Sequence, residues 1–169
     1  PKYVPTSHGS LLVADITYVA TCEGFAYLSL LTDGYSRAIV GYALHPTLSS
    51  EGPLNALQMA LDFYRNRGIK TQGIIHHSDR GIQYASKEYT KKLLENQARI
   101  SMTQTGDPLH NALAERMNNT IKNGWLYDCA QMDFEQARER VDRAIYSYNW
   151  MRPHQAINMK TPMQMFSQN

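Results

Sequence analysis

Residues 11–45 read LLVADITYVATCEGFAYLSLLTDGYSRAIVGYALH, and this stretch decides the fold. It is rich in apolar and β-branched residues and contains two turn signals, Glu23-Gly24 and Asp33-Gly34. Asp-Gly in particular is typical of a tight hairpin. The stretch therefore predicts an antiparallel meander of three strands, over residues 11–20, 25–32 and 37–45.

The hydrophobic pattern after residue 45 alternates between helical and strand-like periods. Cap residues, glycines and a proline mark where these segments begin and end. We expect helices beginning at Ser49 or Ser50, Ser86, Leu109 and Asp133, and strands over residues 73–77 and 98–102. Three antiparallel strands followed by alternating helices and strands predict an α/β fold, in which helices cover both faces of a mixed five-stranded sheet.

Length and composition favour one globular domain. The 169 residues are 43% hydrophobic and 19% charged, which argues against intrinsic disorder. No apolar run approaches the roughly 20 residues of a membrane helix, so we expect no membrane partner. Cys22 and Cys129 have no metal-type spacing and suit a reducing compartment. The chain begins at Pro1 with neither a methionine nor an apolar leader, which is typical of a fragment or processed product and predicts no secretion.

The net charge of +2 is unevenly distributed along the chain. Residues 1–64 carry 2 basic and 5 acidic groups, residues 65–122 carry 10 and 5, and residues 123–169 carry 5 of each. The positive excess therefore lies in the middle third. It permits a polyanionic partner, but a solvated basic face explains it equally well.

Three acidic residues stand out by their positions. Asp15 lies in the middle of the first predicted strand, where a carboxylate is costly unless it meets a cation or a hydrogen-bond donor. Asp79 directly follows the fourth strand, and ligand sites favour such strand ends. Glu115 lies on the third helix. Three carboxylates converging from two strands and a helix suit Mg²⁺ or Mn²⁺, and two such ions about 4 Å apart support phosphoryl transfer.

Helical spacing places Glu115 on a polar stripe of the third helix. At 100° per residue, the same side carries Asn111, Asn118, Asn119 and Lys122. The opposite side carries Leu113, Met117 and Ile121, which we expect to pack on the sheet. A stripe of amide and ammonium groups beside a carboxylate is suited to meeting phosphates.

Several short sequence motifs occur in a fixed order along the chain. They are Asp15-Ile16-Thr17-Tyr18, Asp33-Gly34-Tyr35-Ser36-Arg37, His77-Ser78-Asp79-Arg80-Gly81-Ile82-Gln83-Tyr84, Asn111-Ala112 with Glu115, Tyr148-Asn149 with Arg152-Pro153-His154, and Thr161-Pro162. From Leu11 to Phe166 the chain closely resembles the retroviral-integrase-type catalytic core of bacterial insertion-sequence transposases, the DDE class. It departs from that family at His110, where the family often has Asp. It also departs just before Asp15, where the family often has a Trp and this chain reads Leu12-Val13-Ala14.

This resemblance implies a ribonuclease-H-like fold in which Asp15, Asp79 and Glu115 form the catalytic triad and bind two Mg²⁺ or Mn²⁺ ions per active site. It implies DNA 3′-end cleavage followed by strand transfer, with the element ends and the target as DNA partners. It also implies a homo-oligomer on DNA, an upstream DNA-recognition segment in the full-length protein, and a cytoplasmic, nucleoid-associated location. Residues 1–10 are then an irregular lead-in, and residues 11–169 are the catalytic core domain.

Other polar residues fit either a functional role or a simpler structural one. The candidate DNA contacts are Asn111, Asn118, Asn119, Lys122, Arg80 and Arg152, while the basic residues at 87, 91, 92 and 116 fit either phosphate contact or a solvated face. His76 and His77 raise the possibility of a zinc site, but we expect His77 to fix the loop. Asp33 is expected to build its turn. Tyr146, Tyr148 and Trp150, near the end of the last helix, are expected to be packing residues rather than platforms for stacking DNA bases.

Two other functions remain open beside the transposase. One is a domesticated, inactive core that bridges DNA or binds proteins, although the intact triad argues against it. The other is a ribonuclease-H-like nuclease, which cuts DNA but joins nothing. Assays for metal-dependent stabilisation and for joined products distinguish these functions.

Overall fold

The computed structural model describes residues 3–102 and 108–167, without the side chains of residues 108–111. The described residues form a five-stranded sheet in the order β3-β2-β1-β4-β5. The strands are β1 (Leu11–Thr21), β2 (Gly24–Asp33), β3 (Ile39–His45), β4 (Ile75–Ser78) and β5 (Arg99–Met102). The first three strands pair antiparallel, whereas β4 is parallel to both β1 and β5. The predicted mixed sheet and its meander are confirmed.

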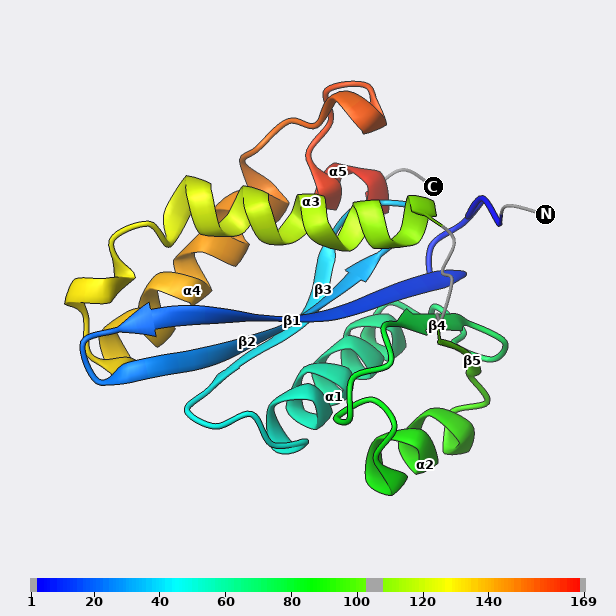
Figure 1. Ribbon diagram of the computed structural model, residues 1–169. Coiled ribbons are helices and arrows are strands. Elements are labelled where there is room, and N and C mark those ends of the chain that lie inside the picture. Colours follow the sequence, from blue (N-terminus) through cyan, green and yellow to red (C-terminus); the bar gives the residue numbers. More distant parts are fainter. Residues whose placement is uncertain (1–2, 103–107, 168–169) are drawn as a thin grey trace.

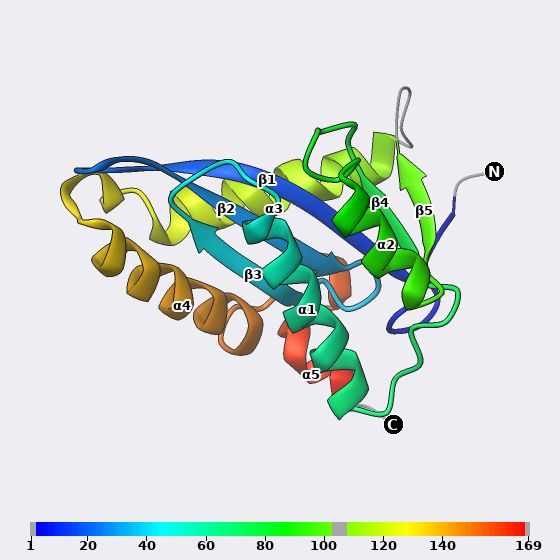
Figure 2. The ribbon, with the colours of Figure 1, turned by 90° about the horizontal axis from the view of Figure 1, so that it is seen from below.

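Helices cover both faces of this sheet, as predicted. They are α1 (Glu51–Asn66), α2 (Lys87–Glu95), α3 (Pro108–Trp125) and α4 (Phe134–Trp150). In Figure 1, α3 lies above the sheet and α1 and α2 lie below it. Figure 2 shows the same arrangement from below, with α1 and α2 in front of the strands and α3 behind them. The chain also contains the short α5 (Pro162–Phe166) and the 3-10 turns Cys129–Gln131 and Gln155–Ile157, which the sequence pattern did not predict.

The alternation of side chains along β1 separates two cores. Leu11 and Val13 are buried in the core under α3 and α4, and Leu12 and Ala14 are buried in the core under α1 and α2. Because successive side chains of a strand point to opposite faces, Asp15 continues the set that faces α3. The strand pattern therefore places this carboxylate under the third helix.

Close packing fixes the position of α1 and α4 against β3. A Cβ atom on Gly41 would overlap the carbonyl oxygen of Ala56, so only glycine allows α1 to lie this close to the strand. From the other side, the Asn149 side chain accepts a hydrogen bond from the Ile39 N–H and donates one to the Ile39 carbonyl, both at 2.9 Å. The Asn149 amide thus satisfies both backbone groups of a residue in an edge strand.

Asp33 builds its turn, as expected, and also joins more distant segments. Its buried carboxylate accepts hydrogen bonds from the Ser36 N–H and hydroxyl and from the Tyr35 N–H. It also accepts from the Gly9 N–H at 2.9 Å and from the Tyr64 hydroxyl at 2.7 Å. The carboxylate therefore ties the N-terminal segment and α1 to the end of β2.

Helix caps agree with the predicted starts. The Ser86 hydroxyl accepts from the Tyr89 N–H, and Asp133 forms a reciprocal capping box with Gln136. Ser50 precedes α1 but makes no side-chain cap. Among residues 3–102 and 108–167, no helix has the length and apolar character needed to cross a bilayer.

Aromatic packing at the end of α4 was predicted only in part. Tyr148 is buried, and its hydroxyl donates to the Arg37 carbonyl oxygen at 2.8 Å. Tyr146 and Trp150 were predicted to be packing residues, but they are 60% and 50% exposed and stack on each other rather than packing in the core. They lie on the outer side of the helix, where packing on the sheet does not reach them.

Candidate active site

The register of two parallel strands brings Asp15 and Asp79 to equivalent positions. Val13 of β1 is paired with His77 of β4. Asp15 lies two residues beyond Val13, and Asp79 lies two residues beyond His77. Since side chains two residues apart share a face, both aspartates follow positions on the same face of adjacent strands. The pairing of β1 with β4 ends at Val13, so both residues lie where the two strands separate.

The third helix supplies the partner of Asp15. The side-chain amide of Asn118 donates a hydrogen bond to Asp15 Oδ2. The amide oxygen of Asn118 is buried and has no hydrogen-bond partner in the described part of the chain. Asn118 therefore links α3 to β1 and offers one further oxygen beside the carboxylate.

The charge environment of Asp15 includes the two other predicted acids. Burial raises the pKa of Asp15 from 3.8 to about 6, while hydrogen bonds from the Ile16 backbone and from Asn118 act in the opposite direction. The negative charges of Asp79 and Glu115 raise the pKa of Asp15 further. An ionised Asp15 is therefore partly desolvated and repelled by two other carboxylates, which is the setting that a cation relieves.

The three carboxylates do not form one ready-made metal-ligand cluster. The exposed Asp79 turns its Oδ1 to the Gly81 N–H at 2.8 Å, and Glu115 is exposed on α3. In the described residues, no three His, Cys, Asp or Glu side chains stand close enough to hold one ion. The donor set nevertheless fits a hard cation, because it consists of carboxylate oxygens with the unpartnered oxygen of Asn118 beside them.

The two histidines before Asp79 belong to the framework. His76 is buried, with Nε2 2.8 Å from the Tyr89 hydroxyl, and His77 is buried with Nδ1 3.1 Å from the Ser101 hydroxyl. Burial lowers the pKa of His76 to about 4. The Nδ1 contact of His77 reaches β5, so the expected role of His77 in fixing the loop stays a prediction.

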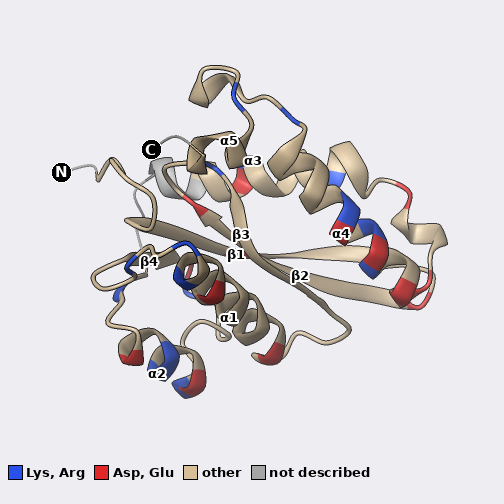
Figure 3. Cartoon of the chain, turned by 180° about the vertical axis from the view of Figure 1, so that it is seen from behind, with Lys and Arg blue, Asp and Glu red and all other residues tan. Residues whose placement is uncertain are grey.

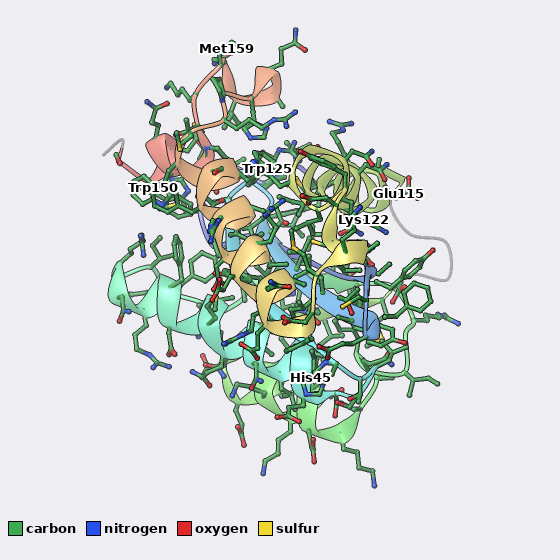
Figure 4. The ribbon with its side chains drawn as sticks, turned by 90° about the vertical axis from the view of Figure 1, so that its left-hand side faces the viewer. His45, Glu115, Lys122, Trp125, Trp150 and Met159 are labelled. Carbon is green, nitrogen blue, oxygen red and sulfur yellow. The ribbon has the colours of Figure 1, made fainter. Side chains whose placement is uncertain are left out.

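The polar stripe of α3 lies largely as its spacing predicted. Leu113, Met117 and Ile121 are buried, whereas Glu115 and Asn119 are exposed. Figure 4 shows Glu115 and Lys122 on the same side of α3. The Lys122 ammonium lies 4.5 Å from the ring centre of Tyr18, the residue that ends the Asp-Ile-Thr-Tyr motif. The side chains of His110 and Asn111 lie outside the described residues.

The remaining candidate DNA contacts are solvent-accessible cations. Arg80 is exposed beside Asp79, and the exposed Arg152 guanidinium lies 5.6 Å from the ring centre of Trp125. By contrast, α2 and α4 carry interspersed acidic and basic residues (Figure 3), and Lys91 pairs with Glu95 at 3.7 Å. This mixture favours a solvated face over a DNA surface on α2.

Two partners of the site were not recognised from the sequence. Tyr84 is buried in the segment that follows Asp79, and burial, followed by the negative charges of neighbouring groups that include Asp15 and Asp79, raises its pKa well above the usual value. Asn118 was taken as a surface residue rather than as the donor to Asp15. The Tyr84 position within its motif was a usable signal, whereas the Asn118 contact depends on how α3 packs on β1.

Comparisons with known proteins agree with this geometry. Two family models, both described as integrase core domain, match residues 5–108 and 96–162. The transposase for insertion sequence element IS629 of Shigella sonnei is 37% identical over 121 residues, covering 72% of this chain and 39% of that protein. Transposase InsF for insertion sequence IS3fB of Escherichia coli is 32% identical over 160 residues, covering 92% of this chain and 53% of that protein. The chain thus spans about half or less of the length of these curated relatives.

A solved structure shows the same fold. The HTLV-2 integrase catalytic core domain, determined in complex with magnesium in a dimeric form, matches with a TM-score of 0.67 and 18% identity. The match covers 94% of this chain and 97% of the viral domain. The ribonuclease-H-like architecture predicted above is therefore confirmed.

Proposed function

The chain belongs to the integrase core domain family, and from this premise we propose that residues 11–169 are the catalytic core of a DDE transposase. Its reaction would be cleavage of DNA at the 3′ ends of an element, followed by transfer of those ends to a target. Its relatives in Shigella sonnei and Escherichia coli are named as transposases, which supports this assignment.

The observation that carries the proposal is the environment of Asp15. This carboxylate sits in the central strand, half-buried, and Asp79 and Glu115 both add negative charge to it. A partly buried carboxylate beside two further negative charges adds nothing to stability, so this environment of Asp15 indicates a chemical role. Phosphoryl transfer is the chemistry that oxygen-rich acidic sites of this kind support.

We propose that Asp15, Asp79 and Glu115 hold Mg²⁺ or Mn²⁺, two ions per site. When bound, divalent ions neutralise the charge that develops on a phosphodiester and favour a nucleophilic oxygen. The role of Asn118 would be to hold the Asp15 carboxylate in one orientation through its amide. Asp79 would exchange its hydrogen bond with the Gly81 N–H for a ligand bond.

The basic and amide groups around the triad would position the DNA. Lys122 and Asn119 lie on the stripe that carries Glu115, and Arg80 follows Asp79 directly. Contacts of this kind to phosphates fix the register of DNA without reading its sequence. The attacking group would be water in the cleavage step and the freed 3′-hydroxyl in the transfer step.

The full protein would work as a homo-oligomer on DNA. The HTLV-2 integrase core was solved in a dimeric form, and the same fold supports an analogous assembly here. The two ends of an element must be held together for transfer, which one catalytic core alone does not provide.

The test is an Asp79→Asn variant assayed with Mn²⁺ on DNA that carries the element ends. Both cleavage and joined products should disappear, whereas DNA binding and folding should persist. Asp62→Asn, a surface carboxylate on α1, is the matched control and should retain both activities. Full strand transfer by Asp79→Asn would refute the proposal. Nicked products without joined ones from the unsubstituted chain would instead identify a nuclease.

A further inference from the structure

A second polar site lies at the start of α3, beside the N-terminal segment. A cavity of about 190 Å³ opens between Tyr3 and Pro5, Leu11 at the start of β1, Gly34 after β2, and α3. Two arginines, Arg37 and Arg116, are among the residues that line it. Figure 1 shows the N-terminal segment and the start of α3 on the same side of the molecule.

The backbone of Arg37 is unusual for this residue type. Its φ angle is +67°, in the left-handed region that glycine or asparagine occupies at lower cost. The conformation is held from both sides, because the Arg37 N–H donates to the Asp33 carbonyl oxygen at 2.9 Å and the Tyr148 hydroxyl donates to the Arg37 carbonyl oxygen at 2.8 Å. An arginine kept at such a position indicates that its side chain has a use.

The two arginine side chains have no directly bonded anionic partner in the described part of the chain. Neither Arg37 nor Arg116 forms a side-chain hydrogen bond or an ion pair there, although Arg37 is only partly exposed. Burial lowers the pKa of Arg37, the charge of Tyr148 acts in the opposite direction, the positive charge of Arg116 lowers the pKa further, and the nearby Asp33 carboxylate raises it. The two positive charges repel each other, and an anion bound between them would offset this repulsion by accepting charge-assisted hydrogen bonds from both guanidinium groups.

We propose that this cavity binds a backbone phosphate of the DNA, separate from the phosphate that reacts at the triad. The inference rests on the proposed function and extends it. Arg116 directly follows Glu115 on α3 and lies about 100° around the helix from it, so the cavity opens on the face of α3 next to the stripe that carries Glu115. The planar, forked guanidinium can donate two hydrogen bonds to a phosphate, and two guanidinium groups in one cavity suit an anion with several acceptor oxygens. The cavity would act as a clamp that holds the strand in place along α3.

The experiment measures binding of a fluorescent DNA duplex over a range of NaCl concentrations, with Asp79→Asn as the background so that no DNA is cut. Arg37→Asn removes the guanidinium but keeps a residue that tolerates the left-handed backbone. Arg116→Gln removes the second charge from an exposed helix position. Arg143→Gln, an exposed arginine on α4, is the matched control.

Each cavity variant should weaken binding on the order of tenfold at low salt and reduce the slope of log affinity against log salt by about 0.9. Arg143→Gln should change neither quantity. The melting temperature of each variant, measured in parallel, reports its folding. If the folded double variant Arg37→Asn/Arg116→Gln keeps the affinity and slope of the background, the cavity holds no DNA phosphate and the proposal is overturned.

A titration with inorganic phosphate separates this inference from the function on which it rests. Phosphate should raise the melting temperature of the unsubstituted chain, and Arg37→Asn should abolish that rise. One outcome is that Arg37→Asn abolishes the phosphate response while Asp79→Asn still performs strand transfer. That result would support the anion site and refute the transposase assignment. Absence of any phosphate response in the unsubstituted chain, combined with unaltered DNA binding by the cavity variants, would remove the site and leave the transposase assignment intact.

Discussion

Replacing Asp15 by Asn should stabilise the metal-free protein. The side-chain amide of Asn118 donates to Asp15, and an asparagine oxygen at position 15 accepts the same hydrogen bond. What the substitution removes is the negative charge, which is disfavoured by burial and by the neighbouring Asp79 and Glu115. Asp15→Asn should therefore increase the free energy of unfolding while destroying the proposed active site.

The size of the gain follows from the raised pKa. A carboxyl group with a pKa of about 6 in the folded chain and 3.8 in the unfolded chain costs about 3 kcal/mol once it is ionised in both states. The stability due to its protonation is fully present below pH 3.8 and is lost as the pH rises through 6. The variant should match the original chain at pH 3.5 or below, roughly, and exceed it by about 3 kcal/mol at neutral pH.

The measurement is urea unfolding of both chains in EDTA at several pH values. At neutral pH the melting temperature of the variant should also be higher, by roughly 6–12 °C for a chain of this size. Asp62→Asn, on the surface of α1, is the control and should change stability by less than about 1 kcal/mol. Mn²⁺ at about 100 times its Kd should add about 2.7 kcal/mol to the original chain and nothing to the variant. An Asp15→Asn variant that is less stable at neutral pH would refute this account of the site.

Three further predictions concern the framework and the DNA surface. Burial lowers the pKa of His76 from 6.5 to about 4, so the chain should lose about 3 kcal/mol of stability through this group as the pH falls from 6.5 to 4. His76→Gln should therefore show a flatter profile of unfolding free energy against pH. Both chains are compared in the Asp15→Asn background, which removes the opposing titration of Asp15. Asn149→Ala leaves the N–H and the carbonyl of buried Ile39 without partners and should cost about 2–4 kcal/mol in urea unfolding. Lys122→Ala should leave the melting temperature nearly unchanged and should reduce the salt slope of DNA binding by about 0.9.

The strands and helices could be predicted because their signals are local. Apolar β-branched runs, Asp33-Gly34 and the cap at Ser86 each act within a few residues, and the structure contains the elements they predict. The third strand was expected to begin at Arg37 but begins at Ile39, because Arg37 adopts a left-handed backbone. The helix α5 was missed, although Thr161 and Gln164 form a readable capping box.

For the candidate site, the sequence pointed to the three acidic residues, and their role stays a prediction. Asp15 and Asp79 stand out by their strand positions and by the motifs around them. The contact of Asn118 with Asp15 joins residues 103 positions apart, and that of Asn149 with Ile39 joins residues 110 positions apart. Such contacts depend on how a whole helix is placed on the sheet, and helical periodicity gives the face of a helix but not its position along a strand.

Two charged side chains near α3, Asp15 and Arg37, lie in unfavourable surroundings, and contacts with neighbouring residues hold them there. Asp15 is a repelled and partly buried carboxylate, and Arg37 has a left-handed backbone and no side-chain ion pair in the described structure. The Asp33 carboxylate fixes the turn that carries Arg37, and the buried Tyr148 hydroxyl fixes the Arg37 carbonyl. Asp15 is held by the side-chain amide of Asn118. Because these contacts depend on neither DNA nor metal, they would spare part of the cost of ordering Asp15 and Arg37 in the proposed function, whereas Asp79 would still have to give up its hydrogen bond with the Gly81 N–H.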